Sequence, residues 1–514
     1  MLVNHNEKFI VPFIFENSYE EVRNILLNKK VKGMDYFLPV KELQETELHA
    51  FINRRFWAED NSHCAIFSVN QNLARNLFEK VYDTATDLNI FIRNIHIYLF
   101  KSGIMFVVFS MEYQKEGGEL TFYDIEETNA YMKDLYVHTN RFLVFDSKIK
   151  LADSIPEEKS FDTIGILEAE AQYTESGTQK ITLLNKKNEP LFSTQIQLYL
   201  NSETGEYIRK ENGFFTTVKN KPNMIKCYKQ EVFSLSGILD QLVMDLGIVF
   251  SDYFSGSTKS IYPKKAILFN MHVLQGEKEK DIRNDLFYCS HGYTHKYQNN
   301  PIGNEVFSAF ENSFWLVTRE GIANINSLEE NEKDHYLNEE FKTRFEVVYL
   351  WIYILVLHQY YGLQFYTCSL LTVYKDSLKA SKKQLKKVIE RLKDIKNDGD
   401  LFLLRYCFTD ISQISHQNDL YDRMTDTYHI EELISDYKNN TEICNNIITE
   451  KHQKSMEKKM NIIAAITSVC SIFSAVVQTI SSMFSFEDEF LIFLPILVII
   501  TVIGALLYML KGDT

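Results

Sequence analysis

Residues 460–484 read MNIIAAITSVCSIFSAVVQTISSMF, and residues 490–510 read FLIFLPILVIITVIGALLYML. Neither stretch contains a charged residue. A helix of 21 residues spans about 31 Å, close to the roughly 30 Å of a bilayer's hydrocarbon core. Both stretches therefore predict transmembrane helices. The residues between them, 485–489, are too few for anything but a turn, so we expect a helical hairpin.

Basic residues flank this predicted hairpin, whereas its turn carries only acids. Lys451, Lys454, Lys458 and Lys459 precede the first stretch, and Lys511 follows the second. Because basic flanks stay in the cytoplasm, we expect a protein of the bacterial cell membrane. Both termini and the large domain would lie on its cytoplasmic side, and the turn would lie on its outer side.

A stripe of hydroxyl and amide side chains distinguishes the first stretch from the second. The stripe comprises Thr467, Ser471, Ser474, Gln478 and Ser481. These residues follow one another at steps of four and three, which places them on one face of a helix. Such a stripe either joins two membrane helices or lines a water-filled pore built by several subunits. In the second interpretation, an acidic ring that attracts cations is formed by Glu487, Asp488 and Glu489.

The composition limits the classes of function. The 514 residues carry 55 Lys and Arg against 69 Asp and Glu, a net charge of −14, which excludes a protein whose main task is to coat nucleic acid. The seven cysteines form no C-x-x-C pair and are typical of free thiols in a reducing cytosol.

Patterns along the rest of the chain predict strands and helices. β-branched and aromatic residues in 91–100 and 104–113, joined by Lys101-Ser102-Gly103, indicate a β-hairpin. The apolar run 347–357 is too short to span a membrane and predicts a buried helix. Residues 375–397 have helical periodicity, and Asp398-Gly399-Asp400 is expected to end that helix.

The predicted fold class is an α+β cytoplasmic domain followed by a long stalk helix and a C-terminal two-helix transmembrane hairpin. The expected segments are an α/β region at 1–230, a helical region at 231–410, a stalk helix at 411–459, a pore-lining helix at 460–484, an external turn at 485–489, a second membrane helix at 490–510 and a cytoplasmic tail at 511–514.

This arrangement resembles the CorA family of divalent-cation channels. The local match is KMNIIAAIT at 459–467 followed by Ser471-Ile472-Phe473, which is similar to the family's junction of stalk and pore. The resemblance implies a CorA-like homo-oligomeric membrane protein, with five subunits by the family's pattern, and adds Asn461 to the pore-lining residues. The family's pore ends in Gly-Met-Asn, whereas residues 481–484 read SSMF, so magnesium selectivity does not carry over.

Other stretches are similar to CorA-like membrane proteins encoded beside type III CRISPR systems. They are YLFKSGI at 98–104, residues 288–297, NSFW at 312–315 and REG at 319–321. The resemblance implies an anti-phage effector activated by a nucleotide messenger, a conjugate of S-adenosylmethionine and AMP.

Residues in the same region mix cations with flat rings, a combination that holds phosphate and stacks on a purine. The candidate ligand-binding residues are Arg283, Tyr288, His291, Tyr293, His295, Lys296, Asn312, Trp315 and Arg319. An aromatic core with cations at its surface is the alternative interpretation of the same pattern.

Metal and enzymatic chemistry receive little support. Cys289, His291 and His295 have a spacing that could supply three zinc ligands, but no fourth partner is evident, so no metal is assigned. No Walker loop, G-x-S-x-G or H-E-x-x-H motif occurs, and we expect a protein that is not an enzyme.

The sequence thus predicts a homo-oligomeric membrane channel, and the resemblance implies that a nucleotide messenger gates it. The chemical partners would be the lipid bilayer, further copies of the chain, the messenger and a divalent cation, without direct contact to nucleic acid. One alternative is a constitutive transporter of magnesium or related cations. Another is a scaffold or enzyme that uses the apolar stretches only as an anchor.

Overall fold

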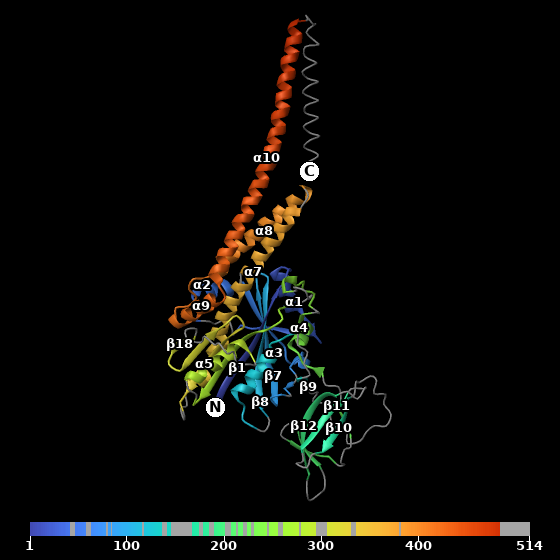
Figure 1. The fold of residues 1–514 in the computed structure, drawn as a ribbon, viewed down its shortest axis with the longest axis vertical. Helices are drawn as coiled ribbons and strands as arrows, with labels where there is room; N and C mark the ends of the chain where they lie inside the picture. The colour runs from blue at the N-terminus through green and yellow to red at the C-terminus, as the bar shows by residue number, and fades with distance from the viewer. Residues whose placement is uncertain are drawn as a thin grey trace. The chain divides into compact units, whose positions relative to one another are not determined.

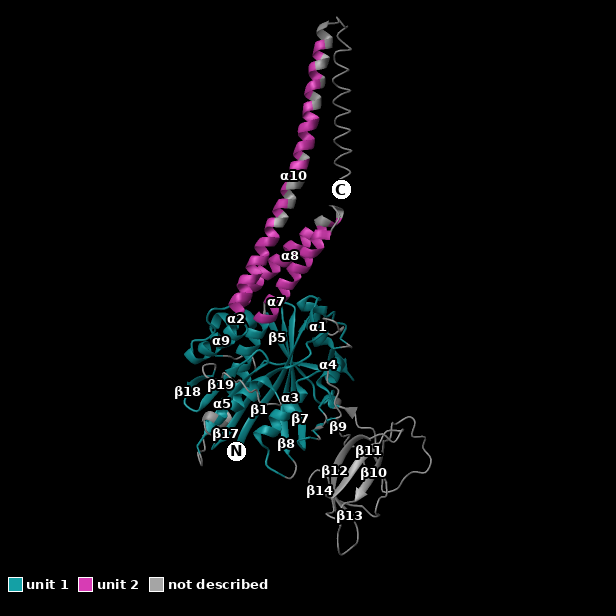
Figure 2. Ribbon diagram, viewed as in Figure 1, with its two compact units in different colours: residues 1–358, 408–428 teal, residues 359–407, 429–514 magenta. Residues whose placement is uncertain are grey.

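The computed structural model of the chain is drawn in Figure 1. It describes residues 1–483 except for 42–46, 58–62, 79–80, 84, 116–117, 136–140, 145–166, 174–177, 185–189, 201–206, 212–213, 219–223, 228–230, 244–245, 255–260, 277–278, 294–305, 330–335 and 380–381. The chain divides into two compact units (Figure 2). Unit 1 comprises Met1–His358 and Phe408–Tyr428, and unit 2 comprises Gln359–Cys407 and His429–Thr514.

A large mixed sheet forms the centre of unit 1. Its described strands lie in the order β16 (Glu231–Val232), β9 (Phe142–Val144), β6 (Val81–Asp83), β7 (Leu88–Phe100), β8 (Ile104–Lys115), β1 (Leu2–Ile14), β17 (Ile267–Gln275), β20 (Gly321–Leu328), β19 (Ser313–Val317) and β18 (Phe307–Phe310). Off this order, β5 (Cys64–Val69) pairs with β7, and β4 (Phe37–Pro39) pairs with β5. The pair β17–β20 is parallel, whereas β1 pairs antiparallel with both of its neighbours.

Helices cover both faces of this sheet. One face is covered by α1 (Tyr19–Asn28), α3 (Phe122–Met132), α4 (Leu235–Val243) and α5 (Glu279–His291). The other face is covered by α2 (Ala50–Trp57), α6 (Phe341–Arg344), the first turns of α7 (Leu350–Lys379) and α9 (Ser415–Thr427). Unit 1 is therefore a three-layer α/β/α arrangement, and the central strands are buried on both faces.

The strand β1 illustrates how side-chain alternation fills both layers. Phe9, Val11 and Phe13 point to the face that α1, α3 and α4 cover. The alternate residues Asn6 and Lys8 point to the opposite face, where both contact Glu346. Because neither face is solvated, polar residues of β1 must find partners inside the protein.

Two smaller sheets accompany the large one. Strands β14 (Phe214–Val218), β13 (Tyr207–Glu211), β12 (Pro190–Leu200), β11 (Thr178–Leu184), β10 (Leu167–Tyr173) and β15 (Met224–Cys227) form one, in that order, with antiparallel pairing. The other is the two-stranded pair β2 (Lys30–Val31) and β3 (Met34–Asp35).

Unit 2 consists of helices in its described part. The second part of α7, α8 (Lys382–Tyr406) and α10 (Ile430–Met483) form it. The packed contact centres on Tyr437 of α10, whose hydroxyl donates to the Lys396 carbonyl of α8 at 2.9 Å. Around it lie Leu370, Val373 and Leu392. This contact involves only the first turns of α10, which continues as one helix of 54 residues.

The expected transmembrane hairpin is corrected by the structure. Among the residues that the structure describes, no helix is long and apolar enough to cross a membrane. Residues 460–483 form the end of α10, where hydroxyl and amide side chains such as Thr467, Ser471 and Gln478 recur every three or four residues. Apolar side chains therefore do not cover the whole circumference of the helix. The predicted turn at 485–489, second membrane helix at 490–510 and tail at 511–514 lie outside the described residues.

Several local predictions can be compared with the structure. The hairpin at 91–113 is confirmed as β7 and β8, with Gly103 at φ +88° in the turn. The buried helix at 347–357 is confirmed in the π-helical turn Phe345–Tyr349 and α7. The helix expected to end at 398–400 instead continues through Gly399 to Tyr406. The region 231–410, expected to be helical, also contains β16 to β20.

Candidate functional site

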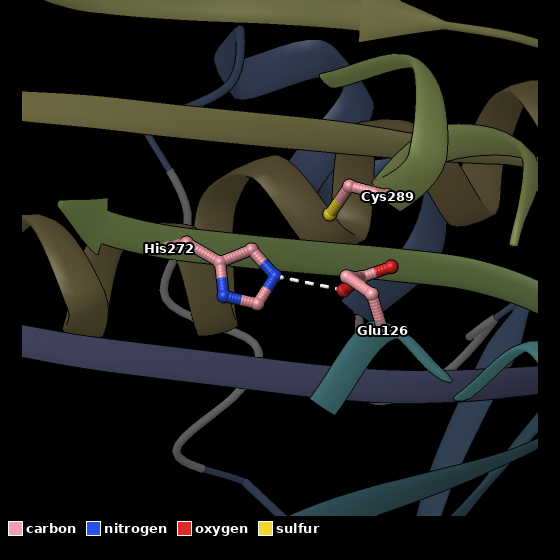
Figure 3. A group of neighbouring side chains, drawn as sticks. All are labelled: Glu126, His272 and Cys289. Carbon is pink, nitrogen blue, oxygen red and sulfur yellow. Dashed lines mark hydrogen bonds and ion pairs between the residues drawn. The ribbon is translucent and has the colours of Figure 1, made fainter. Parts of the chain in front are cut away.

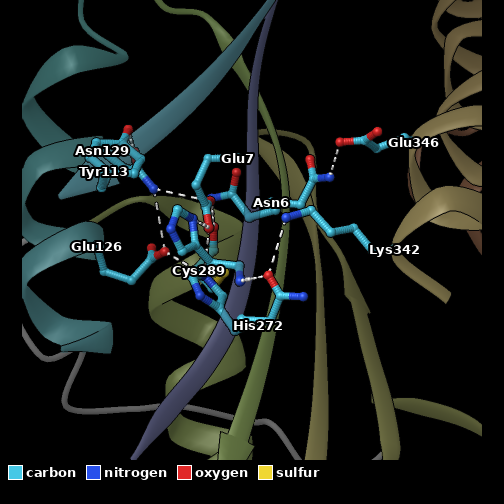
Figure 4. Close-up of polar contacts among 12 residues, drawn as sticks. Asn6, Glu7, Tyr113, Glu126, Asn129, His272, Cys289, Lys342 and Glu346 are labelled. Atoms are coloured by element: carbon cyan, nitrogen blue, oxygen red, sulfur yellow. Dashed lines mark hydrogen bonds and ion pairs between the residues drawn. The ribbon is translucent and has the colours of Figure 1, made fainter. Parts of the chain in front are cut away.

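Four side chains with metal-binding or acid–base chemistry meet in the core of unit 1. Glu7 comes from β1, Glu126 from α3, His272 from β17 and Cys289 from α5. At most 5 % of any of the four residues is exposed. Figure 3 shows Glu126, His272 and Cys289 pointing toward one another, and Figure 4 shows the polar contacts that surround Glu7 and Glu126.

The distances within this acid–histidine–thiol cluster are short. His272 Nε2 lies 3.0 Å from Glu126 Oε1 and 3.3 Å from Glu7 Oε1. The ligand atoms of Glu126, His272 and Cys289 all lie within 4.8 Å of one another. A single ion is therefore within reach of Glu126, His272 and Cys289, and Glu7 adjoins this group through its contact with His272.

The folding of local elements explains this convergence. His5 and His272 lie opposite each other in the β1–β17 ladder, as do Glu7 and Asn270, so Glu7 and His272 share the face that α3 and α5 cover. The helix α3 begins with a capping box of Thr121 and Asp124, which fixes its start.

A second set of polar groups holds the two carboxylates. Asn129, one turn after Glu126 on α3, donates through Nδ2 to Glu7 Oε2 at 3.3 Å and to Glu126 Oε1 at 3.4 Å. Tyr113 of β8 donates its hydroxyl hydrogen to Asn129 Oδ1 at 2.5 Å, which fixes the amide orientation. The ring of Phe122 meets the ring of His272 edge-on at 4.8 Å and covers it.

The electrostatics of the cluster follow from burial and mutual charge. Burial raises the pKa of Glu7 to about 8, with Glu126 adding to the rise and His272 opposing it. Burial by itself lowers the pKa of His272, but the Glu7 and Glu126 carboxylates outweigh it and hold that pKa above its usual value. Burial, with the two carboxylates, raises the pKa of the Cys289 thiol well above its usual range.

Some buried polar atoms of the cluster have no hydrogen-bond partner among the described residues. They are Glu7 Oε1, Glu126 Oε2 and His272 Nδ1. Buried polar groups in folded proteins are nearly always paired, and exceptions point to strain, to chemistry or to an ion or water at the site. The cluster is therefore built from groups that can bind a further species.

The candidate ligand-binding residues are only partly brought together. His291 ends α5, and Tyr293 follows it. Lys133 lies beside both, since it donates to the His291 carbonyl and its Nζ lies 4.9 Å from the centre of the Tyr293 ring. Tyr293 donates to Glu320 Oε1 at 2.9 Å, and the exposed Arg319 precedes Glu320 in the turn between β19 and β20.

Other candidate residues lie elsewhere. Trp315 is 3 % exposed and packs against Phe345 and Tyr349 on the opposite face of the sheet, so it belongs to the aromatic core. Asn312 is exposed in the turn between β18 and β19, with φ +66°. Arg283 and Tyr288 are half-buried on α5. His295 and Lys296 lie outside the described residues.

No metal was assigned to the spacing of Cys289, His291 and His295, and His295 lies outside the described residues. The His291 ring lies against Phe287 at 4.1 Å, and its Nδ1 lies 3.0 Å from the Phe287 carbonyl. Cys289 instead faces Glu126 and His272, which the sequence analysis did not identify. The available signal was a glutamate and a histidine inside β1 and β17, two strands that also carry many buried apolar residues.

The proposed pore-lining residues that the structure describes lie on the exposed surface of α10. Asn461, Thr467, Ser471, Ser474 and Gln478 are all exposed. The hydroxyls of Thr467 and Ser471 donate to the carbonyls four residues earlier, at 2.8 and 2.9 Å. Ser481 lies on α10, its side chain is not described, and Glu487, Asp488 and Glu489 lie outside the described residues.

Comparison with known proteins provides no relative from which a function could be transferred. No protein-family model, no curated protein and no solved structure matches the chain.

Proposed function

We propose that the protein is a nucleotide-responsive defence effector that works as a homo-oligomer. Unit 1 is the sensing part, and copies of the chain associate through α10. The proposal includes no membrane-spanning pore, because the described helices provide none. The observation that carries it is the exposed apolar surface along the C-terminal half of α10.

Exposed residues recur along this stretch of the helix. Between Met460 and Thr479, every described side chain is exposed except Ile466, which is half-buried. Met460 and Ile472 are each 65 % exposed, and Ile463 is 54 % exposed. Single chains rarely expose so many large apolar side chains together, and such surfaces mark contacts with a partner. A symmetric assembly of identical chains is the commonest partner arrangement for soluble proteins.

The hydroxyl groups on the same stretch support burial in an assembly. Thr467, Ser468, Ser471 and Thr479 all donate to carbonyls of their own helix at 2.7–2.9 Å. Their donors are therefore satisfied without water, which lowers the free-energy cost of burying them against another helix.

The oligomeric state of the full chain, measured by sedimentation velocity, tests the association. We expect the unmodified chain to sediment as an oligomer at micromolar concentration. The double variant Ile463→Glu/Ile472→Glu should sediment as a smaller species, because buried charges oppose the contact. Leu404→Glu is the matched control, since Leu404 is 75 % exposed on α8, and it should leave the oligomer unchanged. A monomeric unmodified chain would contradict the proposal.

The ligand class rests on the resemblance to CRISPR-associated effectors, together with the cation and ring at the end of α5. Lys133 and Tyr293 are in contact there, and Arg319 is exposed in the adjoining turn. A phosphate-bearing ligand with a purine ring needs such groups. The conjugate of S-adenosylmethionine and AMP is the ligand that we propose.

Calorimetry on the full chain tests this part separately. The conjugate should bind, and Arg319→Ala should weaken it at least tenfold, because a hydrogen bond to a charged group contributes about 1.5–3 kcal/mol. Arg23→Ala removes an exposed cation of α1 as the control and should leave the affinity unchanged. The absence of heat with the conjugate would remove the messenger from the proposal while leaving the association intact.

A further inference from the structure

The acid–histidine–thiol cluster lies apart from the association surface and has its own chemistry. We propose that Glu7, Glu126, His272 and Cys289 form a closed binding site for one Zn²⁺ ion in the core of unit 1. The site would join β1, α3, β17 and α5, elements that lie far apart along the chain.

The distances fit an ion held by Glu126, His272 and Cys289, with the adjoining Glu7 as its fourth ligand. Zinc lies about 2.0–2.2 Å from nitrogen and oxygen ligands in tetrahedral sites, so neighbouring ligand atoms are roughly 3.3 Å apart. His272 Nε2 lies 3.0 Å from Glu126 Oε1 and 3.3 Å from Glu7 Oε1. The Cys289 sulfur lies within 4.8 Å of the Glu126 and His272 ligand atoms, and a zinc–sulfur bond is longer, at about 2.3 Å.

The unpartnered atoms give independent support. Glu7 Oε1 and Glu126 Oε2 belong to residues that are 0 % and 5 % exposed, yet neither has a hydrogen-bond partner among the described residues. A cation between the two carboxylates would give both oxygens a partner. It would also neutralise negative charge that is otherwise costly at this depth.

The second layer of contacts is arranged as metal sites require. Ligating carboxylates in metal sites are themselves held by hydrogen bonds. Here Asn129 donates to both Glu7 and Glu126, and Tyr113 holds the Asn129 amide. These hydrogen bonds thus hold the two carboxylates close to His272.

The ligand types select the ion and the role. A thiolate with an imidazole favours Zn²⁺ over Mg²⁺ or Ca²⁺, which prefer oxygen ligands alone. All four residues are at most 5 % exposed, so no coordination position is open to a substrate. Closed four-ligand zinc sites stabilise folds, and we assign this ion a structural role.

The competing occupant is a proton shared by the two carboxylates and His272. Both occupants explain a buried His272 between two acids, but only a metal ion requires Cys289. The thiol therefore distinguishes the two in an experiment.

Metal analysis of the purified full chain by mass spectrometry is the first measurement. We expect about one zinc ion per chain, and Cys289→Ser should reduce that content several-fold. Cys64→Ser is the matched control, because Cys64 is also a buried thiol of unit 1 and lies on β5, away from the cluster. Metal-free protein, or equal zinc in the two variants, would overturn the inference.

Cobalt substitution keeps the inference testable if Cys289→Ser does not fold. Co²⁺ added to the chelator-treated unmodified chain should give a thiolate-to-cobalt charge-transfer band in the near ultraviolet. Tyr113→Phe, which leaves all four ligands in place, should weaken Zn²⁺ binding about 10- to 100-fold through the loss of Asn129 orientation. The absence of this band would overturn the inference, since Cys289 would not be a ligand.

These measurements are made on the resting chain without a messenger. The protein can therefore lack zinc while the proposed association and ligand binding are confirmed, and it can contain zinc while they are not.

Discussion

Unit 1 buries charged side chains in its core, whereas the end of α10 exposes apolar ones. Glu7, Glu126 and His272 lie between the sheet and its covering helices, and Ile463 and Ile472 lie on the helix surface. Each arrangement reverses the usual distribution of residue types. The two differ in what would satisfy them, since the buried cluster needs an ion or proton and the exposed helix needs an apolar partner.

Removal of His272 should have the largest effect on stability. His272→Ala leaves Glu7 and Glu126 buried beside each other without their counter-charge, and breaking a buried ionic group costs about 3–5 kcal/mol. All three tryptophans, Trp57, Trp315 and Trp351, lie in unit 1, so urea denaturation followed by their fluorescence reports this unit.

The control for this variant is a histidine outside the core. His429→Ala removes an exposed side chain of unit 2 and should change the free energy of unfolding of unit 1 by less than about 0.5 kcal/mol. A loss of less than about 1 kcal/mol of unfolding free energy for His272→Ala would mean that the cluster tolerates an unpaired acid. The buried cluster would then need no partner, unlike the exposed helix.

A glycine inside α8 gives the next largest effect. Gly399→Ala would place Cβ 2.3 Å from the Tyr437 hydroxyl and 2.6 Å from its ring carbon Cζ. The expected result is destabilisation of unit 2 by about 1–3 kcal/mol, because the packed ring must move. In an open helical site the same change stabilises by about 1 kcal/mol.

Thiol labelling of Cys444 measures the packing of unit 2. Cys444 is buried beside Tyr437, so faster labelling of the Cys444 peptide would report loosened packing of α8 on α10. Gly118→Ala meets no atom within 4 Å and should leave the labelling rate unchanged. Unchanged labelling in Gly399→Ala would show that the packing of α8 on α10 accommodates the added methyl group.

Gly399 also shows where sequence patterns mislead. A glycine between two aspartates is typical of a helix end, yet Gly399 lies inside α8 and allows the close approach of Tyr437 from α10. Gly103, by contrast, was correctly placed in a turn, because its positive φ is a local requirement of the hairpin. Local requirements can be read from a sequence, whereas a requirement set by a distant residue cannot.

The candidate site follows the same rule. Cys289 was noticed, but it was grouped with His291 and His295 because they are close in sequence. Its spatial neighbours Glu126 and His272 come from other elements, and only the β1–β17 register brings Glu7 to them. The apolar stretch 460–484 is helical as far as Met483, but the prediction that it crosses a membrane is wrong, because no described helix is long and apolar enough.

A pH dependence of stability is expected from another buried histidine. His358 stacks on Phe100 at 4.1 Å, and its Nε2 lies 2.6 Å from Ser102 Oγ. Burial, with a contribution from His63, lowers the pKa of His358 to about 3. The unfolded chain therefore binds a proton below pH 6.5 that the folded chain excludes. Stability is complete above 6.5 and falls between 6.5 and 3, by about 1.4 kcal/mol per pH unit.

His358→Gln isolates this contribution. Unfolding free energies of both proteins, measured by urea denaturation from pH 7.5 to 4.5, should diverge at high pH and approach each other as the pH falls. Parallel curves would mean that His358 takes up its proton in the folded state as readily as in the unfolded one.

The smallest effect is expected on the hydroxyl stripe of α10. The Thr467 hydroxyl already donates to the Ile463 carbonyl at 2.8 Å, and Ser471 donates to Thr467. Thr467→Ala and Ser471→Ala should therefore each change the free energy of unfolding by at most about 0.5 kcal/mol. Neither should change the oligomeric state measured by sedimentation velocity. If Thr467→Ala dissociated the oligomer as fully as Ile463→Glu, the hydroxyls rather than the apolar side chains would hold the copies together. The exposed face of α10 would then be held by polar contacts, as the cluster in unit 1 is, and the contrast between the two regions would be lost.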